Sequence, residues 1–403
     1  MKKNYKVNKF FALLMCLFFN FLYPCKISRQ LEFGLFSQNE HVVSSAISSS
    51  GENLVMSIKK FPGSFILSWN LQQDSAIQNY IVDSCKEIKF SQNDIYIGFN
   101  WGNRLDIRKI HDQNFESRFN VNQRGTCICG FDISENFDTV VYYDTDNNIY
   151  FYNLKNPTTP ISMLKEPCTI RAVRFITQKT GRGFLAVETL YAIKFYDVFT
   201  CTLKHAYMIK DKTGDRFRSF CGICVDDGCY SAINSMTEDG RLETEIHLYP
   251  TDEEKTRKKY SKINVHSKLW VMDAPKCTSN PDVILFTGRK IYGSDIYEQV
   301  TLFSISENKY INFKLFKIEM DIAAYCKLLT PESLQNDSIL LHNGRLLNAQ
   351  FTSKNQLIIF LKSSPTVGIN MTYAIFIDID FNSPNPDFQV IYRKLNGKFY
   401  LAN

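Results

Sequence analysis

A six-residue pattern of apolar and polar positions recurs seven times along this chain of 403 residues. It consists of an apolar residue, any residue, an apolar residue, a bulky residue, a usually polar residue and an apolar residue. Such runs predict β-strands, and the Asn, Asp and Gly residues that bound them predict hairpin turns. The copies occupy residues 66–71, 105–110, 149–154, 193–198, 246–251, 300–305 and 374–379.

The spacing of these copies predicts an all-β fold. Successive copies begin 39, 44, 44, 53, 54 and 74 residues apart. A period of about 40 to 45 residues is typical of a β-propeller, in which small sheets stack in a ring. Two apolar strands precede the better-defined copies, and an outer strand follows some of them, for example at residues 310–316 and 388–392. We therefore expect a seven-bladed β-propeller of four-stranded antiparallel blades.

An aromatic residue followed by Asn or Asp fills the fourth and fifth positions of three copies. The pairs are Trp69-Asn70, Tyr152-Asn153 and Tyr196-Asp197. They resemble the Trp-Asp pair that ends the third strand in the WD40-type propeller family. That family also has a Gly-His pair before the first strand. Here His41 lies before the first strand of its unit, but Glu40 replaces the glycine, so the resemblance implies the fold and not the buried hydrogen-bond relay of the family.

Two regions depart from the period of the propeller, which we place at residues 30–403. Residues 319–345 form an insertion, in which Thr330 followed by Pro331 favours the start of a short helix. The fifth and sixth units are over-length near residues 255–262 and 288–298. Insertions in repeat proteins often lie on the binding face, although neutral variation in loop length is an equal explanation.

Closure of the ring requires a strand that completes the last blade. Residues 31–37 could pair there from the N-terminal side. Alternatively, a hairpin through Asn396 and Gly397 could place residues 398–401 in that position. Either arrangement covers an edge that would otherwise promote aggregation.

The first 25 residues have the composition of a secretory signal peptide. Four lysines precede an apolar run at residues 10–23, which is too short to span a bilayer comfortably. An uncleaved anchor and a buried segment are the alternatives.

The number of cysteines agrees with this leader. Removal of Cys16 and Cys25 with the leader would leave ten of the 12 cysteines, an even number that favours disulfides in an oxidising compartment. Buried reduced cysteines are the alternative.

Three cysteines form the sharpest local cluster. Cys221, Cys224 and Cys229 are disulfide candidates, because there is no second CxxC for zinc and no predicted helix to activate a thiolate. Cys127 and Cys129 lie two apart on one expected strand, where a relaxed mutual bridge does not form.

Two sequons and one acidic turn complete the candidate sites. Asn336 and Asn370 begin N-glycosylation sequons, and we expect both outside the core strands. Residues 144–148 resemble the start of a calcium loop but lack its closing glutamate, so we expect a hairpin turn.

No motif assigns a reaction, a metal or a cofactor to this chain. The six histidines are dispersed, and the net charge of +6 comes from scattered basic residues, which argues against nucleic-acid binding. We therefore expect a secreted or secretory-pathway scaffold that binds a protein or glycan partner. It would be a monomeric fold within a complex, with no membrane contact beyond a possible N-terminal anchor. The alternatives are a propeller hydrolase or lyase with a site in the central channel, and an intracellular WD40-like assembly scaffold.

Overall fold

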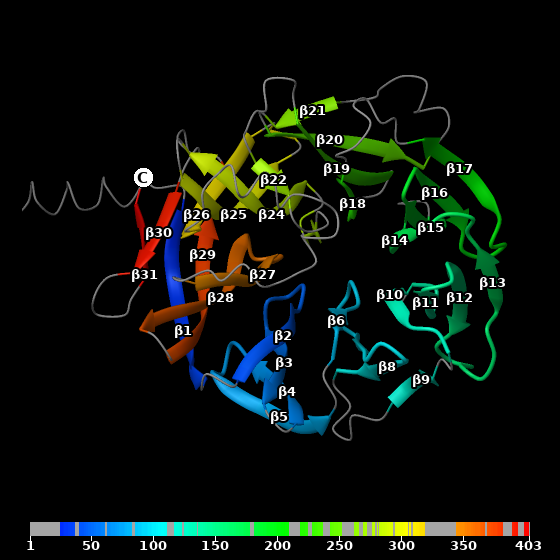
Figure 1. Cartoon of the computed structure of the whole chain (residues 1–403), viewed down its shortest axis with the longest axis horizontal. Helices are drawn as coiled ribbons and strands as arrows, with labels where there is room; N and C mark the ends of the chain where they lie inside the picture. The colour runs from blue at the N-terminus through cyan, green and yellow to red at the C-terminus, as the bar shows by residue number, and fades with distance from the viewer. Residues whose placement is uncertain are drawn as a thin grey trace, which may run out of the picture.

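The chain folds into seven β-sheets arranged as a ring (Figure 1). Each sheet is a blade, and we number the blades in chain order. Among the residues that the structure describes, six sheets have four strands and one has seven. The computed structural model describes residues 25–36, 40–60, 63–82, 85–110, 117–122, 125–134, 136–177, 181–208, 218–224, 228–236, 242–251, 262–265, 269–271, 276–278, 280, 282–292, 295–304, 306–307, 309–318, 344–366, 369–381, 389–393 and 399–402.

Blades 1 to 4 repeat one antiparallel order, which we give from the inner to the outer strand. Blade 1 contains β2 (Glu40–Ile47), β3 (Asn53–Lys60), β4 (Gly63–Asn70) and β5 (Ser75–Val82). Blade 2 contains β6 (Glu87–Phe90), β7 (Tyr96–Asn100), β8 (Arg104–Lys109) and β9 (Ser117–Asn122). Blade 3 contains β10 (Ile128–Ser134), β11 (Thr139–Asp144), β12 (Asn148–Asn153) and β13 (Ser162–Lys165). Blade 4 contains β14 (Ile170–Thr177), β15 (Gly183–Thr189), β16 (Ala192–Asp197) and β17 (Leu203–Met208).

Blades 5 to 7 complete the ring. Blade 5 contains β18 (Arg218–Cys224), β19 (Gly228–Met236), β20 (Leu242–Pro250) and β21 (Lys262–Val265). Blade 6 contains β22 (Leu269–Val271), β23 (Lys276–Cys277), β24 (Val283–Tyr292), β25 (Asp295–Ser304) and β26 (Lys309–Ile318), extended by β30 (Gln389–Arg393) and β31 (Phe399–Ala402). Blade 7 contains β27 (Gly344–Phe351), β28 (Gln356–Thr366), β29 (Ile369–Ile379) and β1 (Cys25–Phe36).

The repeated six-residue pattern marks the third strand of every blade, as the sequence predicted. Its last apolar position has a structural role, because its backbone N–H donates to a carbonyl at or beside the turn that joins the first and second strands. Leu71 is buried and donates to Glu52 at 2.7 Å. The same bond runs from Ile110 to Ile95, from Leu154 to Asp138, from Val198 to Gly183 and from Ile379 to Asn355.

The hydrophobic core lies between neighbouring blades. Alternate residues of one strand belong to different clusters: Leu357 and Ile359 pack at the junction of blades 6 and 7, whereas Ile358 packs at the junction of blades 7 and 1. Burial on both faces explains why β28 begins as a continuous apolar run and does not alternate with polar residues.

The N-terminal strand closes the ring. β1 pairs antiparallel with β29, and the register places Cys25 opposite Ile379 (Figure 1). This is the first of the two closures that the sequence allowed. The strand is longer than expected, because it begins at Cys25 and not at residue 31.

The C-terminal hairpin extends blade 6, which corrects one expectation. Residues 388–392 were expected as the outer strand of the last blade, but the observed strand β30 pairs parallel with β26, and β31 then pairs with β30. The position expected for β30 is taken by β1. The over-length stretch at residues 288–298 was expected as a loop insertion. Instead it extends strands β24 and β25, whose last paired residues before the turn are Tyr292 and Asp295.

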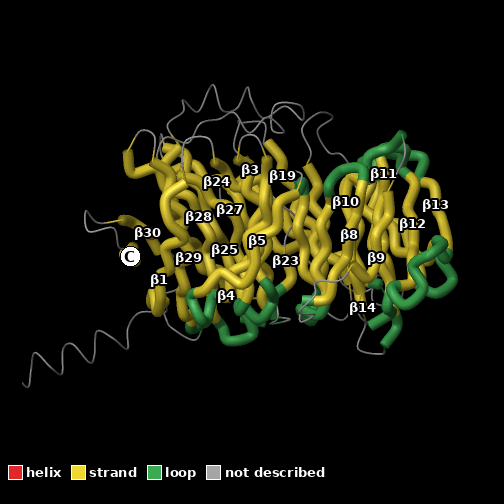
Figure 2. The backbone as a smooth tube through the Cα atoms, turned by 90° about the horizontal axis from the view of Figure 1, so that it is seen from below, coloured by secondary structure: helices red, strands yellow, loops and turns green. Residues whose placement is uncertain are grey.

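The strands run between the two faces of the ring, and no helix occurs among the described residues (Figure 2). Nor does the described part of the chain contain a helix long and apolar enough to cross a membrane. Cys25, the last residue of the expected leader, begins β1, and Lys262, the last residue of the expected loop at 255–262, begins β21. The rest of the leader (residues 1–24), the rest of that loop (residues 255–261) and the helix expected near Thr330 lie outside the described residues.

Candidate functional site

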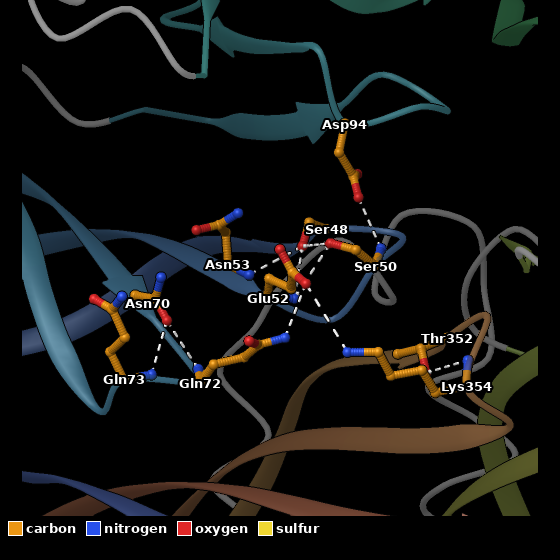
Figure 3. A network of polar contacts seen from close by, with 10 residues as sticks. All are labelled: Ser48, Ser50, Glu52, Asn53, Asn70, Gln72, Gln73, Asp94, Thr352 and Lys354. Carbon is orange, nitrogen blue, oxygen red and sulfur yellow. Dashed lines mark hydrogen bonds and ion pairs between the residues drawn. The ribbon is translucent and has the colours of Figure 1, made fainter.

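The polar residue of the strand pattern fixes the turn that follows the third strand. Asn70 Oδ1 accepts the backbone N–H groups of Gln72 and Gln73, both at 2.9 Å (Figure 3). Asn153 and Asp197 accept N–H groups from their own following turns in the same way. These side chains therefore act as turn caps, a common role of Asn and Asp.

The aromatic residue of the pattern packs differently in each copy. Trp69 makes an edge contact with Phe33 of β1, with ring centroids 5.0 Å apart. Tyr152 packs on Phe119 of the preceding blade. The Tyr196 hydroxyl donates to the buried carboxylate of Glu166. All three aromatics therefore stabilise contacts between blades.

His41 differs from its expected place. It lies inside β2, opposite Lys59, and its side chain is exposed. Partial burial, followed by the nearby charges of Lys59 and Lys362, lowers its pKa. An exposed histidine next to two lysines does not form the buried relay of the WD40-type family.

A polar network joins blades 7, 1 and 2 on one face of the ring (Figure 3). The carboxylate of Asp94 accepts the backbone N–H groups of Ser49 and Ser50, each at 2.7 Å. Glu52 accepts the Gln72 amide at 2.8 Å and lies 3.9 Å from the Lys354 ammonium. Each polar group in this network bonds to another part of the protein, so we assign it to the stability of the ring.

The inner strands of blades 2 to 4 carry a cluster of ionisable side chains. Lys89 Nζ lies 3.3 Å from Glu87 and 3.8 Å from Asp132, and it donates to the Phe131 carbonyl at 2.5 Å. Burial, followed by the charge of Arg174, lowers the pKa of Lys89. This is the place where a channel enzyme would need its catalytic groups.

The geometry of this cluster does not favour catalysis. Asp132 also accepts the Phe175 N–H at 2.7 Å, so the ion cluster ties blade 2 to blade 3 and blade 3 to blade 4. A catalytic acid, base or nucleophile needs access to a substrate atom, and these groups are satisfied by one another. Within the described part of the chain, no group of three or more His, Cys, Asp or Glu side chains could hold a metal ion.

The residues of the calcium-like turn form a hairpin, as expected. Asp144 ends β11, and Asn148 begins β12. The buried Asp144 carboxylate accepts the backbone N–H groups of Asp146 and Asn148, both at 2.9 Å, and the Tyr150 hydroxyl at 3.1 Å. This carboxylate therefore organises the turn.

The cysteine candidates do not oppose one another across the sheet. The register of blade 5 pairs Cys229 with Ile223 and Cys224 with Gly228, while Cys221 pairs with Ser231. Cys127 and Cys129 were expected on one strand, but Cys127 lies just before β10 and only Cys129 lies in it. Both side chains are exposed. The thiols that the structure describes, at Cys25, Cys85, Cys127, Cys129, Cys168 and Cys201, are free.

One sequon is placed differently from the expectation. Asn370 lies in β29, opposite Phe36, and the sequon's Thr372 is only 1% exposed. A core strand is an unfavourable place for a glycan, because glycans require a surface loop. Asn336 lies outside the described residues.

Most of the exposed large hydrophobic residues of the described chain lie on blades 3 and 4, and we call this set of residues the rim surface. Seven of the nine exposed large hydrophobic residues of the described chain fall between residues 161 and 208. Five are more than half exposed: Phe199 at 70%, Met208 at 65%, Met163 at 58%, Ile161 at 57% and Tyr191 at 55%. Leu203 and Leu190 complete the set.

Three of these residues, Met163, Leu203 and Met208, lie on the outer strands β13 and β17. β13 and β17 are the outer strands of neighbouring blades (Figure 1). The register places Leu203 opposite Tyr196 and Met208 opposite Ala192, so the apolar side chains occur at both ends of β17. Several exposed apolar residues on neighbouring blades favour an interaction surface, whereas single exposed residues are ordinary.

The strand pattern did not reveal the rim surface. Met163, Leu203 and Met208 are exposed because β13 and β17 are the outermost strands of their blades and no other strand pairs with their outer edges among the described residues. The only signal in the sequence was that residues 203–208, LKHAYM, lack the continuous apolar run of the inner strands.

Comparison with known proteins identifies the fold. No protein-family model matches the chain, and no curated protein sequence matches it. Among solved structures, the β-propeller domain of Cps50 (Swd1) from Myceliophteria thermophila has a TM-score of 0.54 at 9% identity, over 88% of this chain and 100% of that chain. The chain has a WD40-like β-propeller fold. A chain of a mitotic checkpoint complex matches at a TM-score of 0.49 and 11% identity, over 88% of this chain and 92% of that one.

Proposed function

We propose that this WD40-like propeller is a scaffold that binds a protein partner through the rim surface. The observation that carries this proposal is the concentration of exposed hydrophobic side chains between residues 161 and 208. Burial of a large apolar side chain contributes about 1.5 to 3 kcal/mol. A partner that covered several of these side chains would therefore gain considerable binding free energy.

The chemistry of the rim surface favours a protein over a glycan. Sugar hydroxyls require hydrogen-bond acceptors on the protein. The exposed side chains here are those of Ile, Leu, Met, Phe and Tyr, and Met and aromatic residues are enriched at protein interfaces. A catalytic role has less support, because the ion cluster around Lys89 is internally satisfied.

The decisive experiment compares two matched variants in affinity purifications from the native source. Leu203→Ser with Met208→Ser removes apolar side chains from the rim surface. Val43→Ser with Ile95→Ser removes the two exposed ones that lie on other blades. We expect recovery of a partner to fall by about 10-fold or more in the first variant only, which corresponds to about 1.4 kcal/mol. Equal recovery from both variants, each with the melting temperature of the wild type, would refute the proposal.

We further propose that the leader directs the scaffold into the secretory pathway. Support comes from the lysines before residue 10 and the short apolar run that follows. Intact mass of the native protein tests this proposal. A mass that lacks the leader, with or without disulfides or glycans, would support it. A full-length, reduced and unmodified mass would favour the intracellular assembly scaffold.

A further inference from the structure

The C-terminal hairpin, which consists of β30 and β31, pairs with the outer edge of blade 6. The outer strand of the repeat is β26 in this blade, as it is β5, β9, β13, β17 and β21 in blades 1 to 5. In the described part of the chain, no further strand pairs with the outer edges of those five strands. On β26 the hairpin adds two strands at that edge (Figure 1). The outer edge of β26 therefore accepts an additional strand.

A short parallel ladder holds the hairpin to β26. Phe313 lies opposite Gln389, and Lys314 lies opposite Val390. The other edge of β26, by contrast, pairs antiparallel with β25 over eight residue pairs. Parallel pairing is also slightly less stable per residue than antiparallel pairing. The backbone of β30 is therefore held less firmly than that of a strand inside the sheet.

A buried isoleucine anchors the hairpin to the core. Ile391 directly follows the paired residue Val390 and is only 5% exposed. It belongs to the same core cluster as Leu315 of β26 and Cys25 of β1. A site that recognises an added strand combines a backbone edge, which gives affinity, with a position for a side chain, which gives specificity. Both parts are present here.

We propose that the outer edge of β26 is a strand-binding site, which the C-terminal hairpin of the same chain occupies and thereby inhibits. The ligand that replaces the hairpin is an extended segment of a protein partner. This segment runs parallel to β26 and places a branched aliphatic side chain where Ile391 lies. The site is on blade 6, across the ring from the rim surface on blades 3 and 4, so the inference does not depend on the proposed function (Figure 1).

Tethering explains how the hairpin inhibits the site. Residues 380–388 connect β29 to β30 and keep the hairpin close to β26. A segment on a short tether competes at an effective concentration on the order of millimolar. A free segment binds only the molecules whose hairpin is released, so its apparent affinity falls by that fraction. Any change that weakens the hairpin should therefore strengthen binding of the partner.

A labelled peptide of residues 388–402 is the probe, and the same peptide with Ile391→Ser is its control. Fluorescence anisotropy measures binding to the full-length wild type and to two full-length variants. Ile391→Ser removes the anchor, and Val390→Pro removes a backbone N–H group from β30. Both variants should bind the probe at least about 10-fold more tightly than the wild type. Val43→Ser with Ile95→Ser, which alters blades 1 and 2, should bind it no more tightly than the wild type.

Two results with the peptides would overturn the inference. One is that neither variant, each with a cooperative melting transition, binds the probe more tightly than the wild type. The other is that the variants bind the control peptide as tightly as the probe, because the position of Ile391 would then confer no specificity.

Hydrogen exchange in the full-length wild type tests release of the hairpin without any substitution. A two-stranded hairpin that leaves the sheet is marginally stable and loses its protection. We expect the amide groups of residues 389–393 to exchange at least about 10-fold faster than those of β24, because local opening costs less than unfolding of the sheet. Equal exchange rates would mean that the hairpin leaves only when the propeller unfolds, and the inference would fail.

Discussion

The carboxylate of Asp94 lies 2.7 Å from the backbone nitrogen of Ser50 and joins blade 2 to blade 1 (Figure 3). Asp94 also has a φ of 58°, a left-handed conformation that Asp and Asn adopt more readily than most residues. One residue therefore both completes a tight turn and connects two repeats.

Substitution of Asp94 should lower the free energy of unfolding. Asp94→Ala removes the acceptors for the N–H groups of Ser49 and Ser50 and disfavours the positive φ, so we expect a loss of about 2 kcal/mol. Asp94→Asn retains one acceptor oxygen and the tolerance of positive φ, so the loss should be about 1 kcal/mol. Urea unfolding measures both, and an unchanged stability of Asp94→Ala would contradict this role.

Removal of β1 should open the ring. A chain that begins at residue 37 leaves the β29 edge uncovered, and exposed strand edges promote aggregation. A chain that begins at Cys25 retains the complete strand and should remain monomeric and folded. Size-exclusion chromatography with light scattering compares the two, and a soluble folded monomer from the shorter chain would contradict closure by β1.

Two buried thiols predict a loss of stability in alkali. Burial raises the pKa of Cys25 and of Cys85 from the ordinary value of 9.0 to about 12, and Asp380 adds to the effect at Cys25. The unfolded chain therefore loses these protons first. Stability is complete below about pH 8 and falls as the pH rises from about 9 toward 12.

At about pH 10, each thiol should account for roughly 1 to 2 kcal/mol of lost stability. Urea unfolding at pH values near 8 and 10 measures this loss in the wild type and in Cys85→Ala. The variant should lose less stability between the two conditions, because it lacks one of the groups. An identical loss in both proteins would show that Cys85 does not contribute.

Gly98 permits blades 2 and 3 to approach each other. A Cβ atom at this position would lie 2.3 Å from the Phe131 ring. Gly98→Ala should therefore destabilise the fold by about 1 to 3 kcal/mol. Phe131→Leu in the same chain should relieve the clash, so a double-mutant cycle should show a favourable coupling of about 1 kcal/mol. Additive effects would contradict the contact.

The repeated architecture was predictable because local physics determines it. The apolar pattern at residues 149–154 and 193–198 follows from burial on both faces of a strand, and the Asn and Asp residues after it follow from turn geometry. The position of β30 was not predictable, since residues 389–393 pair with β26 across a long stretch of intervening sequence. The rim surface around Met208 depends on the same kind of long-range arrangement.

The most direct test of the account is photo-crosslinking from single positions of the ring in the native source. A photoreactive residue at Leu203, on the rim surface, is compared with one at Val43, on blade 1. We predict that a protein partner crosslinks from Leu203 and not from Val43. Crosslinks from Val43 alone would place the binding site on another part of the ring and contradict the account.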